Sequence, residues 1–295
     1  MTTRSYRVAL LELHLAVLLF GLAGVLGKAI TAGALMIVFG RSAVAALTLG
    51  LGLALGLKNR RQSFAWPRTQ RLGLVASGLL LAVHWLAFFH AINLSSVAVG
   101  VVGYATAPLF VVMLEPLLSG TRLRPADSLT ALAVLVGLYL VASPDDATQR
   151  LAAIGWAVFS GFTFALLTLL NRHLVQGVSF LYVAFCQQAG AAICLLPIVL
   201  LSGVALPGTQ DLLLIGVLGL ACSALAQTLF VKSLGHLKAQ LASVVSGLEP
   251  IYAIVLATLM LGDRPAPATL LGAGIVLLAV TAATLMHPTP TASDD

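Results

Sequence analysis

The chain has 295 residues, of which 60% are hydrophobic and only 9% are charged, and its net charge is +6. A soluble domain carries roughly 25% charged residues, so this composition excludes a water-soluble globular protein and predicts an all-α integral membrane protein in a lipid bilayer. The basic residues are spread among loops between apolar runs. That distribution excludes a nucleic-acid-binding face and reports membrane topology instead.

Ten segments have the length and apolar character of a membrane helix, which needs about 20 mostly apolar residues. They are 8–28, 34–57, 72–92, 96–118, 126–143, 151–170, 178–202, 210–231, 238–261 and 266–286. The first follows Arg4 and Arg7 and is longer than the core of a signal peptide, so we interpret it as an uncleaved membrane helix. The connections are too short for a soluble domain, and the tail 288–295 is expected to be disordered.

The distribution of Lys and Arg predicts the orientation. With a cytoplasmic N-terminus, twelve of the 16 basic residues lie inside, three lie outside, and Arg41 lies within a span. The excess of inside charge predicts cytoplasmic termini and a multi-pass protein of the bacterial inner membrane. The aqueous segment 58–71 would then also be cytoplasmic.

The three cysteines, Cys186, Cys194 and Cys222, lie within apolar segments and form no Cys-x-x-Cys pair. They are expected to be small packing residues. The sequence therefore predicts no disulfide framework, no metal site and no cofactor.

The two halves of the chain repeat each other. Segment 120–126 reads GTRLRPA and segment 262–268 reads GDRPAPA, and the same shift aligns Pro108 with Pro250. Each half holds five spans, and because five is odd the second half enters the membrane from the opposite side. The sequence thus predicts two five-helix inverted repeats, 1–145 and 146–287. Inverted repeats are typical of secondary transporters that work by alternating access.

A second repeated block, Phe39-x-Arg41 followed by Ala45 and Ala46, aligns with 185–192. On these blocks the chain resembles the drug/metabolite transporter superfamily in its ten-span EamA-type branch, over nearly its whole length. Its nearest likeness is to YddG-like exporters of aromatic amino acids. The resemblance implies export of amino acids, other metabolites or drugs. The chain departs from the family pattern at Thr121, where the family usually has an acidic residue. The second half keeps that residue as Asp263.

Polar side chains within the spans mark the candidate site, since a charge at the centre of a membrane costs at least about 2.5–3.5 kcal/mol. The candidates for substrate binding are His84, Trp85, Tyr104, Ser243, Ser246, Trp156 and Tyr182. Trp156 could instead belong to an interfacial aromatic belt. Arg41 and Gln187 occupy equivalent repeat positions, which favours a structural role for both. Lys232 and His90, also equivalent, are expected to anchor helix ends.

The prolines of the fourth and ninth spans are candidate gating positions. Pro108 frees the carbonyl of Tyr104, and Pro250 frees that of Ser246. Unpaired backbone at membrane depth requires protein or water to satisfy it, so we expect these two faces to oppose each other across a central cavity. The alternative is that the prolines only kink the helices for packing.

No HExxH or GxSxG motif and no pair of intramembrane aspartates is present, so an enzyme is not expected. The sequence predicts a secondary transporter, expected to be monomeric, that exports small organic metabolites, including aromatic amino acids. The alternative is a proton-coupled exporter of cationic drugs in which proton and drug share Glu12. That residue lies early in the first span, where it could also complement the helix dipole.

Overall fold

The regular structure of the described residues, 3–56, 67–119, 125–141, 147–237 and 239–286 of the computed structural model, is entirely helical. The helices are α1 (Thr3–Ala29), α2 (Ala34–Ala54), α3 (Arg68–Leu94), α4 (Val97–Tyr104), α5 (Ala107–Ser119), α6 (Pro125–Val141), α7 (Ala147–Leu174), α8 (Phe180–Leu201), α9 (Thr209–Val217), the π-helix η2 (Leu218–Leu225), α10 (Ala226–Leu234), α11 (Ala239–Ser246), α12 (Glu249–Leu261) and α13 (Pro267–Met286). The all-helical class expected from the sequence is confirmed for these residues.

Seven helical segments of the described chain are long and apolar enough to cross a membrane. They are Tyr6–Ala29, Ala34–Ala54, Arg68–Leu94, Val97–Leu114, Gln149–Leu174, Phe180–Leu201 and Thr209–Leu234. Large apolar side chains such as Leu47, Leu79 and Leu259 lie exposed on the outside of the bundle. Extensive exposed apolar surface is what a protein surrounded by lipid presents. The chain is therefore a multi-pass membrane protein.

The predicted spans overlap the observed helices, but two of the spans are interrupted. Segment 96–118 is divided into α4, which ends at Tyr104, and α5, which begins at Ala107. Segment 238–261 is divided into α11, which ends at Ser246, and α12, which begins at Glu249. A proline is the second residue of both α5 and α12. Proline is tolerated in a first turn, where its missing N–H has no partner to lose, so each proline starts a new helix directly after the break.

A glycine on a neighbouring helix faces each break at close range. A Cβ atom on Gly161 of α7 would lie 2.8 Å from the carbonyl oxygen of Tyr104. A Cβ atom on Gly21 of α1 would lie 3.1 Å from the backbone nitrogen of Ala253, one turn into α12. The absence of a side chain at these two positions lets α7 and α1 approach the interrupted helices closely.

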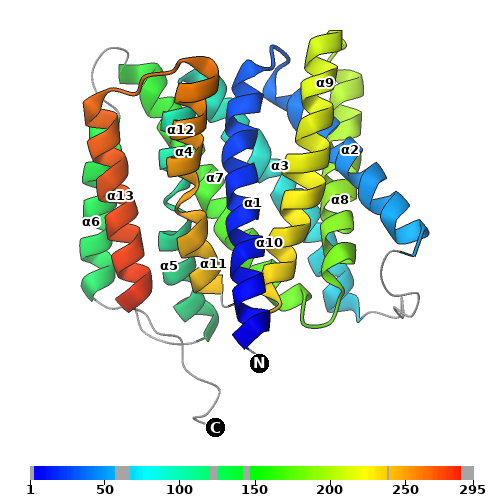
Figure 1. Ribbon diagram of the computed structural model, residues 1–295, viewed down its shortest axis with the longest axis horizontal. Coiled ribbons are helices and arrows are strands. Elements are labelled where there is room, and N and C mark those ends of the chain that lie inside the picture. Colours follow the sequence, from blue (N-terminus) through cyan, green and yellow to red (C-terminus); the bar gives the residue numbers. More distant parts are fainter. Residues whose placement is uncertain (1–2, 57–66, 120–124, 142–146, 238, 287–295) are drawn as a thin grey trace.

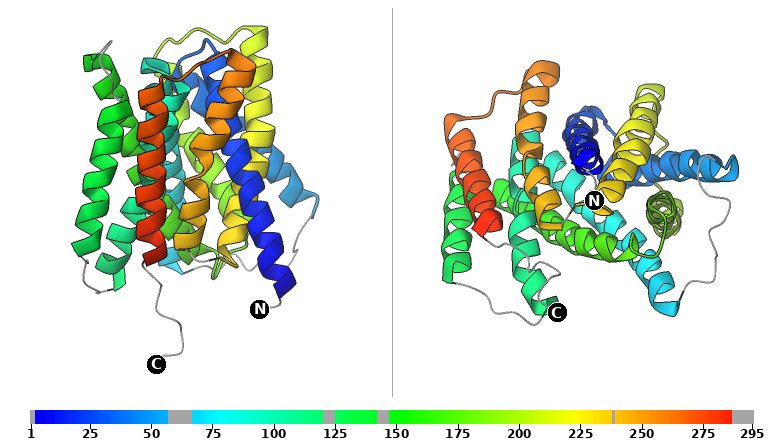
Figure 2. Two further views of the ribbon diagram at one scale, coloured as in Figure 1. Left: turned by 60° about the vertical axis from the view of Figure 1, so that its left-hand side comes forward. Right: turned by 60° about the horizontal axis from the view of Figure 1, so that its bottom comes forward.

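Several pairs of helices pack closely against each other. α7 packs along α4 and α5, and α1 packs along α12; α3 contacts α7, and α1 contacts α10. α2 lies against α8 and α6 against α13, with the latter pair at one edge of the bundle (Figures 1 and 2). α1 begins and α13 ends on the same side of the molecule (Figure 1). The largest core lies between α1, α3, α4, α7, α8 and α10.

Candidate functional site

A cluster of aromatic rings occupies the centre of the bundle where helices from both halves of the chain meet. His84 of α3 lies at centroid distances of 4.8 Å from Trp85, 5.7 Å from Tyr104 and 5.1 Å from Phe164. Phe20 of α1 extends the cluster, 6.0 Å from Trp85. Edge-to-face and tilted pairs at these separations are favourable arrangements of aromatic rings. All five side chains are buried, so the cluster is closed to solvent in this conformation.

His84 is held against the helix that faces it. Its Nδ1 atom lies 2.9 Å from Oγ of Ser160 and 3.0 Å from the carbonyl oxygen of the same residue. The hydroxyl of Thr163 also donates to that carbonyl, at 2.9 Å. These contacts fix the imidazole between α3 and α7, one residue before Gly161.

The two interrupted helices are joined by a hydrogen bond at the cluster. The Tyr104 hydroxyl, on the last residue of α4, is hydrogen-bonded to the carboxyl of Glu249, the first residue of α12. Both side chains are buried. A carboxylate at the start of a helix also meets the positive end of the helix dipole. This contact brings the two proline-containing breaks together at the centre of the molecule.

Arg41 of α2 lies over the ring of Trp85. Its Cζ atom is 3.7 Å from the centroid of the Trp85 ring, a close cation–π contact. Its Nε donates to Oγ of Ser223 at 2.7 Å, and its Nη2 donates to the carbonyl oxygen of Cys222 at 2.9 Å. Nη1 has no hydrogen-bond partner among the described residues, although the side chain is only 1% exposed.

The π-helix explains how Arg41 is held. Cys222 and Ser223 lie within η2, where the helix turn is wider than in an α-helix. The Ser223 hydroxyl donates to the carbonyl oxygen of Leu218 at 2.9 Å, five residues back, and accepts from Arg41. Single π-turns occur often at functional sites. This one supplies both polar contacts to the guanidinium from one side.

Three buried amide side chains form a hydrogen-bonded network among helices of the second half. Gln187 of α8, the repeat equivalent of Arg41, is hydrogen-bonded to Asn171 of α7 and accepts from Gln227 of α10 at 2.8 Å. All three side chains are buried. This network of amides links α7, α8 and α10. It agrees with the structural role expected for Gln187.

The sequence-predicted site residues fall into two groups. His84, Trp85 and Tyr104 lie together in the cluster, with Pro108 and Pro250 at the adjoining breaks. Ser246 ends α11 and is buried, and its hydroxyl donates to the carbonyl oxygen of its own helix at Ala242. The side chain of Ser243 lies outside the part of the chain that the structure describes.

Trp156 and Tyr182 lie apart from the cluster. Trp156 is 44% exposed, and its ring contacts His90 at 5.2 Å. It lines a shallow surface groove with Ala152, Gly155 and Phe159. Tyr182 is partly buried near the start of α8, with its ring 6.0 Å from that of Phe185. The structure therefore does not bring these two aromatic residues together with His84 and Trp85.

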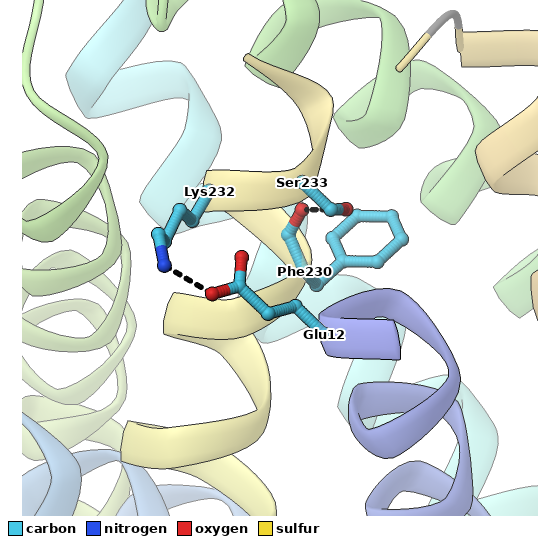
Figure 3. Close-up of polar contacts among 4 residues, drawn as sticks. All are labelled: Glu12, Phe230, Lys232 and Ser233. Atoms are coloured by element: carbon cyan, nitrogen blue, oxygen red, sulfur yellow. Dashed lines mark hydrogen bonds and ion pairs between the residues drawn. The ribbon is translucent and has the colours of Figure 1, made fainter. Parts of the chain in front are cut away.

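Glu12 is ion-paired with Lys232, and this contact joins α1 to α10 (Figure 3). The two side chains are 16% and 29% exposed. Glu12 precedes Phe20 by eight residues, which is about 12 Å along a helix. The carboxylate thus lies more than two turns from the aromatic cluster and has a basic partner of its own.

Arg41 and Glu249 lie beside the cluster and are not among the binding residues predicted from the sequence. Both were visible as charged residues within apolar spans, the signal that marks an intramembrane functional group. The repeat position of Arg41 favours a structural role, and no pattern in the sequence singles out Glu249 beside Pro250. Among the described residues, no group of three His, Cys, Asp or Glu side chains gathers as a metal site would require.

The fold and this buried centre define a helical membrane protein in which helices from both halves of the chain enclose a polar and aromatic core. Residues 8–143 and 151–285 each match the EamA-like transporter family. The chain belongs to this family, which is part of the drug/metabolite transporter superfamily. It is thus a member of a transporter family, whose substrates are small molecules.

Two relatives of the chain are also named as transporters. It is 24% identical to the uncharacterized transporter YxxF of Bacillus subtilis strain 168 over 268 residues, which are 90% of this chain and 85% of that protein. It is 29% identical over 154 residues to an uncharacterized transporter of Helicobacter pylori strain J99, half of each chain. A solved crystal structure superposes with a TM-score of 0.64 over 94% of this chain and 97% of the other, at 21% identity. That likeness shows a shared fold.

Proposed function

We propose that this protein is a secondary transporter that exports small organic metabolites, including aromatic amino acids, by alternating access. One observation carries the proposal: Tyr104 and Glu249 join two interrupted helices at a closed, aromatic centre. Small-molecule sites are mostly apolar, with a few convergent polar groups. Discontinuous helices that meet at mid-membrane are typical of substrate sites in secondary transporters.

The alternating-access part of the proposal rests on ten spans arranged as two inverted five-helix repeats, 1–145 and 146–287. The family matches the chain twice, once in each half. Basic residues near the ends of α1 and α7 make similar contacts. Lys28, near the end of α1, donates to the carbonyl oxygens of Ile92 and Ser95 at the end of α3. Arg172, near the end of α7, donates to the carbonyl oxygen of Leu234 at the end of α10.

The close glycines support the same repeat. Gly21 of α1 faces the start of α12, and Gly161 of α7 faces the end of α4. Each half therefore places its first helix against the interrupted helix of the other half. Two halves with the same internal contacts can exchange shapes at little cost in free energy, which is the basis of alternating access in inverted repeats.

An exporter of cationic drugs that uses Glu12 is the rival function. A cation site needs a carboxylate that is free to pair with the ligand and aromatic walls around it. Glu12 is already paired with Lys232, and it lies more than two helical turns from Phe20 in the cluster. These contacts favour the amino-acid exporter. We place the protein in the bacterial inner membrane with both termini cytoplasmic, because of the distribution of its basic residues.

Uptake by proteoliposomes tests the proposal. Purified protein would be reconstituted and supplied with a panel of labelled amino acids and cationic dyes, with and without a pH gradient. We expect saturable uptake of one or more aromatic amino acids above protein-free liposomes. Uptake of dyes alone, driven by the pH gradient, would instead support the rival exporter.

A further inference from the structure

The guanidinium of Arg41 is held rigidly on one side and is unpartnered on the other. The Cζ atom of Arg41 lies 3.7 Å from the centroid of the Trp85 ring. Its Nε donates to Oγ of Ser223, and its Nη2 donates to the carbonyl oxygen of Cys222. Nη1 carries two more N–H groups and has no partner in the described part of the chain. A buried donor without an acceptor costs about 1–3 kcal/mol, and more when it is charged. The arrangement is therefore incomplete without an acceptor at Nη1.

The chemistry of a guanidinium decides which acceptor fits. Arginine donates in a planar fork that matches the geometry of a carboxylate, and it remains charged when buried. The stacking on Trp85 and the two bonds to η2 fix the plane of the fork before any ligand arrives. Such preorganisation lowers the cost of binding because fewer side-chain rotations are lost. A carboxylate is thus the group that this donor would bind.

A carboxylate alone would satisfy only one of the two buried ionisable residues beside the cluster. Glu249 is also buried and interacts electrostatically with Arg41, yet no ion pair joins the two side chains in the part of the chain that the structure describes. A ligand with only a negative charge would be attracted by Arg41 and would leave Glu249 without a cationic partner. A ligand that also carries an ammonium group pairs with Arg41 and stabilises the ionised carboxylate of Glu249. Arg41 and Glu249 together therefore select a zwitterion.

We infer that Arg41 and Glu249 form a two-point binding site for α-amino acids, in which Nη1 of Arg41 binds the carboxylate and Glu249 binds the ammonium group. Trp85 and Tyr104, which contact these two residues, then lie beside the substrate's side chain. This inference rests on the proposed function and adds to it the groups that recognise the substrate's charges. The repeat does not duplicate Arg41, because the residue at the equivalent position of the second half is the neutral Gln187.

Binding of four matched ligands to the full-length purified protein tests the inference. The ligands are phenylalanine, phenylalaninamide without the carboxylate, 3-phenylpropionate without the ammonium group, and phenethylamine. We expect phenylalanine to bind the wild-type protein roughly ten- to hundredfold more tightly than any of the three single-charge analogues, the effect of losing one hydrogen-bonded charge. This comparison needs no variant, so it holds even if a substitution impairs folding.

Variants assign each charge to its residue. Arg41→Gln should lower the affinity for phenylalanine to that for phenylalaninamide and leave the amide's affinity unchanged. Glu249→Gln should do the same relative to 3-phenylpropionate. Arg172→Gln is the matched control, since it makes the same substitution at an arginine that contacts a helix end. It should preserve the preference for phenylalanine over its amide.

Two results would overturn the inference. The first is equal binding of phenylalanine and its amide to the wild-type protein. The second is an Arg41→Gln protein that loses affinity for both ligands by the same factor, as a purely structural residue would cause. If amino acids are transported and either result is found, only the inference fails. If no amino acid is bound or transported, the proposed function fails with it.

Discussion

The Tyr104 hydroxyl is hydrogen-bonded to the carboxyl of Glu249, across the point where α4 ends and α12 begins. These residues are 145 positions apart in the chain, and each lies at a break that a proline follows. The contact couples the two interrupted helices directly. A movement of one half relative to the other must therefore stretch or exchange this bond.

Tyr104→Phe removes the bond while keeping the ring. We expect a loss of about 1–3 kcal/mol in the free energy of unfolding, because the buried carboxyl of Glu249 loses a donor. Thermal unfolding of the purified protein measures it, and uptake by proteoliposomes should fall as well. Tyr139→Phe is the control, since Tyr139 is exposed on the outer surface. Equal melting temperatures for the two variants would show that the bond contributes nothing to stability.

Gly161→Ala places a methyl group where the structure leaves no room. The new Cβ would lie 2.8 Å from the carbonyl oxygen of Tyr104, which belongs to backbone that cannot turn aside. We expect about 1–3 kcal/mol of destabilisation from overpacking, together with reduced transport. On the same helix, Gly155 has nothing within 4 Å of an added Cβ. Gly155→Ala should therefore stabilise the helix by about 0.5–1 kcal/mol, so the two substitutions should shift the melting temperature in opposite directions.

The location of the helices could be predicted from the sequence, because length and apolar composition suffice to mark a membrane helix. Pro108 and Pro250 also predict freed carbonyls at Tyr104 and Ser246, whereas the structure divides each of these spans into two helices. The direction in which the side chains point could not be predicted from the sequence. In a soluble helix the polar face points outward, whereas here lipid and core are both apolar, so Trp156 on the surface and Trp85 in the core have similar sequence surroundings.

The arrangement around Arg41 could not be predicted for a different reason. Its partner Ser223 is 182 residues away, on a π-helix. Sequence patterns assume regular α-helical turns, and the wider turns of η2 change which groups face α2. The pairing of Glu12 with Lys232 was hidden in the same way, since it depends on how α1 packs along α10.

The ion pair of Glu12 with Lys232 gives a test of coupling. If Glu12 contributes to a proton or substrate path, Glu12→Gln should reduce transport and flatten its dependence on pH. The pair itself is partly exposed, so its loss should cost only about 0.2–1 kcal/mol of stability. The exchange Glu12→Lys with Lys232→Glu should restore stability without restoring the pH dependence. Unchanged transport at every pH in Glu12→Gln would assign the residue to the ion pair alone.

The proposed orientation can be checked by labelling single cysteines in a variant in which Cys186, Cys194 and Cys222 are replaced. Phe64→Cys lies in the segment predicted to be cytoplasmic, so it should resist a membrane-impermeant maleimide applied to intact cells and react after lysis. Ala205→Cys lies in the exposed connection between α8 and α9, on the predicted outer side, and should react in intact cells. The reverse pattern would invert the topology.

The aromatic walls of the cluster should set the size of the substrate. Trp85 and Tyr104 are buried against His84, at centroid distances of 4.8 and 5.7 Å from its ring. Replacing either by Ala removes apolar contact area, and each Å² of lost contact weakens binding by about 25 cal/mol. A large aromatic amino acid would lose more of this contact than a small one. We therefore expect Trp85→Ala and Tyr104→Ala to lower the ratio of phenylalanine to alanine transport.

That ratio separates a wall from a structural residue. A substitution that only reduces the amount of folded protein lowers the transport of all substrates equally, and normalisation to protein in the membrane removes its effect. Trp156→Ala is the matched control, because Trp156 is a tryptophan on the outer surface of the same bundle. Its ratio should equal that of the wild type. Ratios unchanged in both Trp85→Ala and Tyr104→Ala would place the substrate elsewhere and remove the reason for preferring aromatic amino acids over other small metabolites.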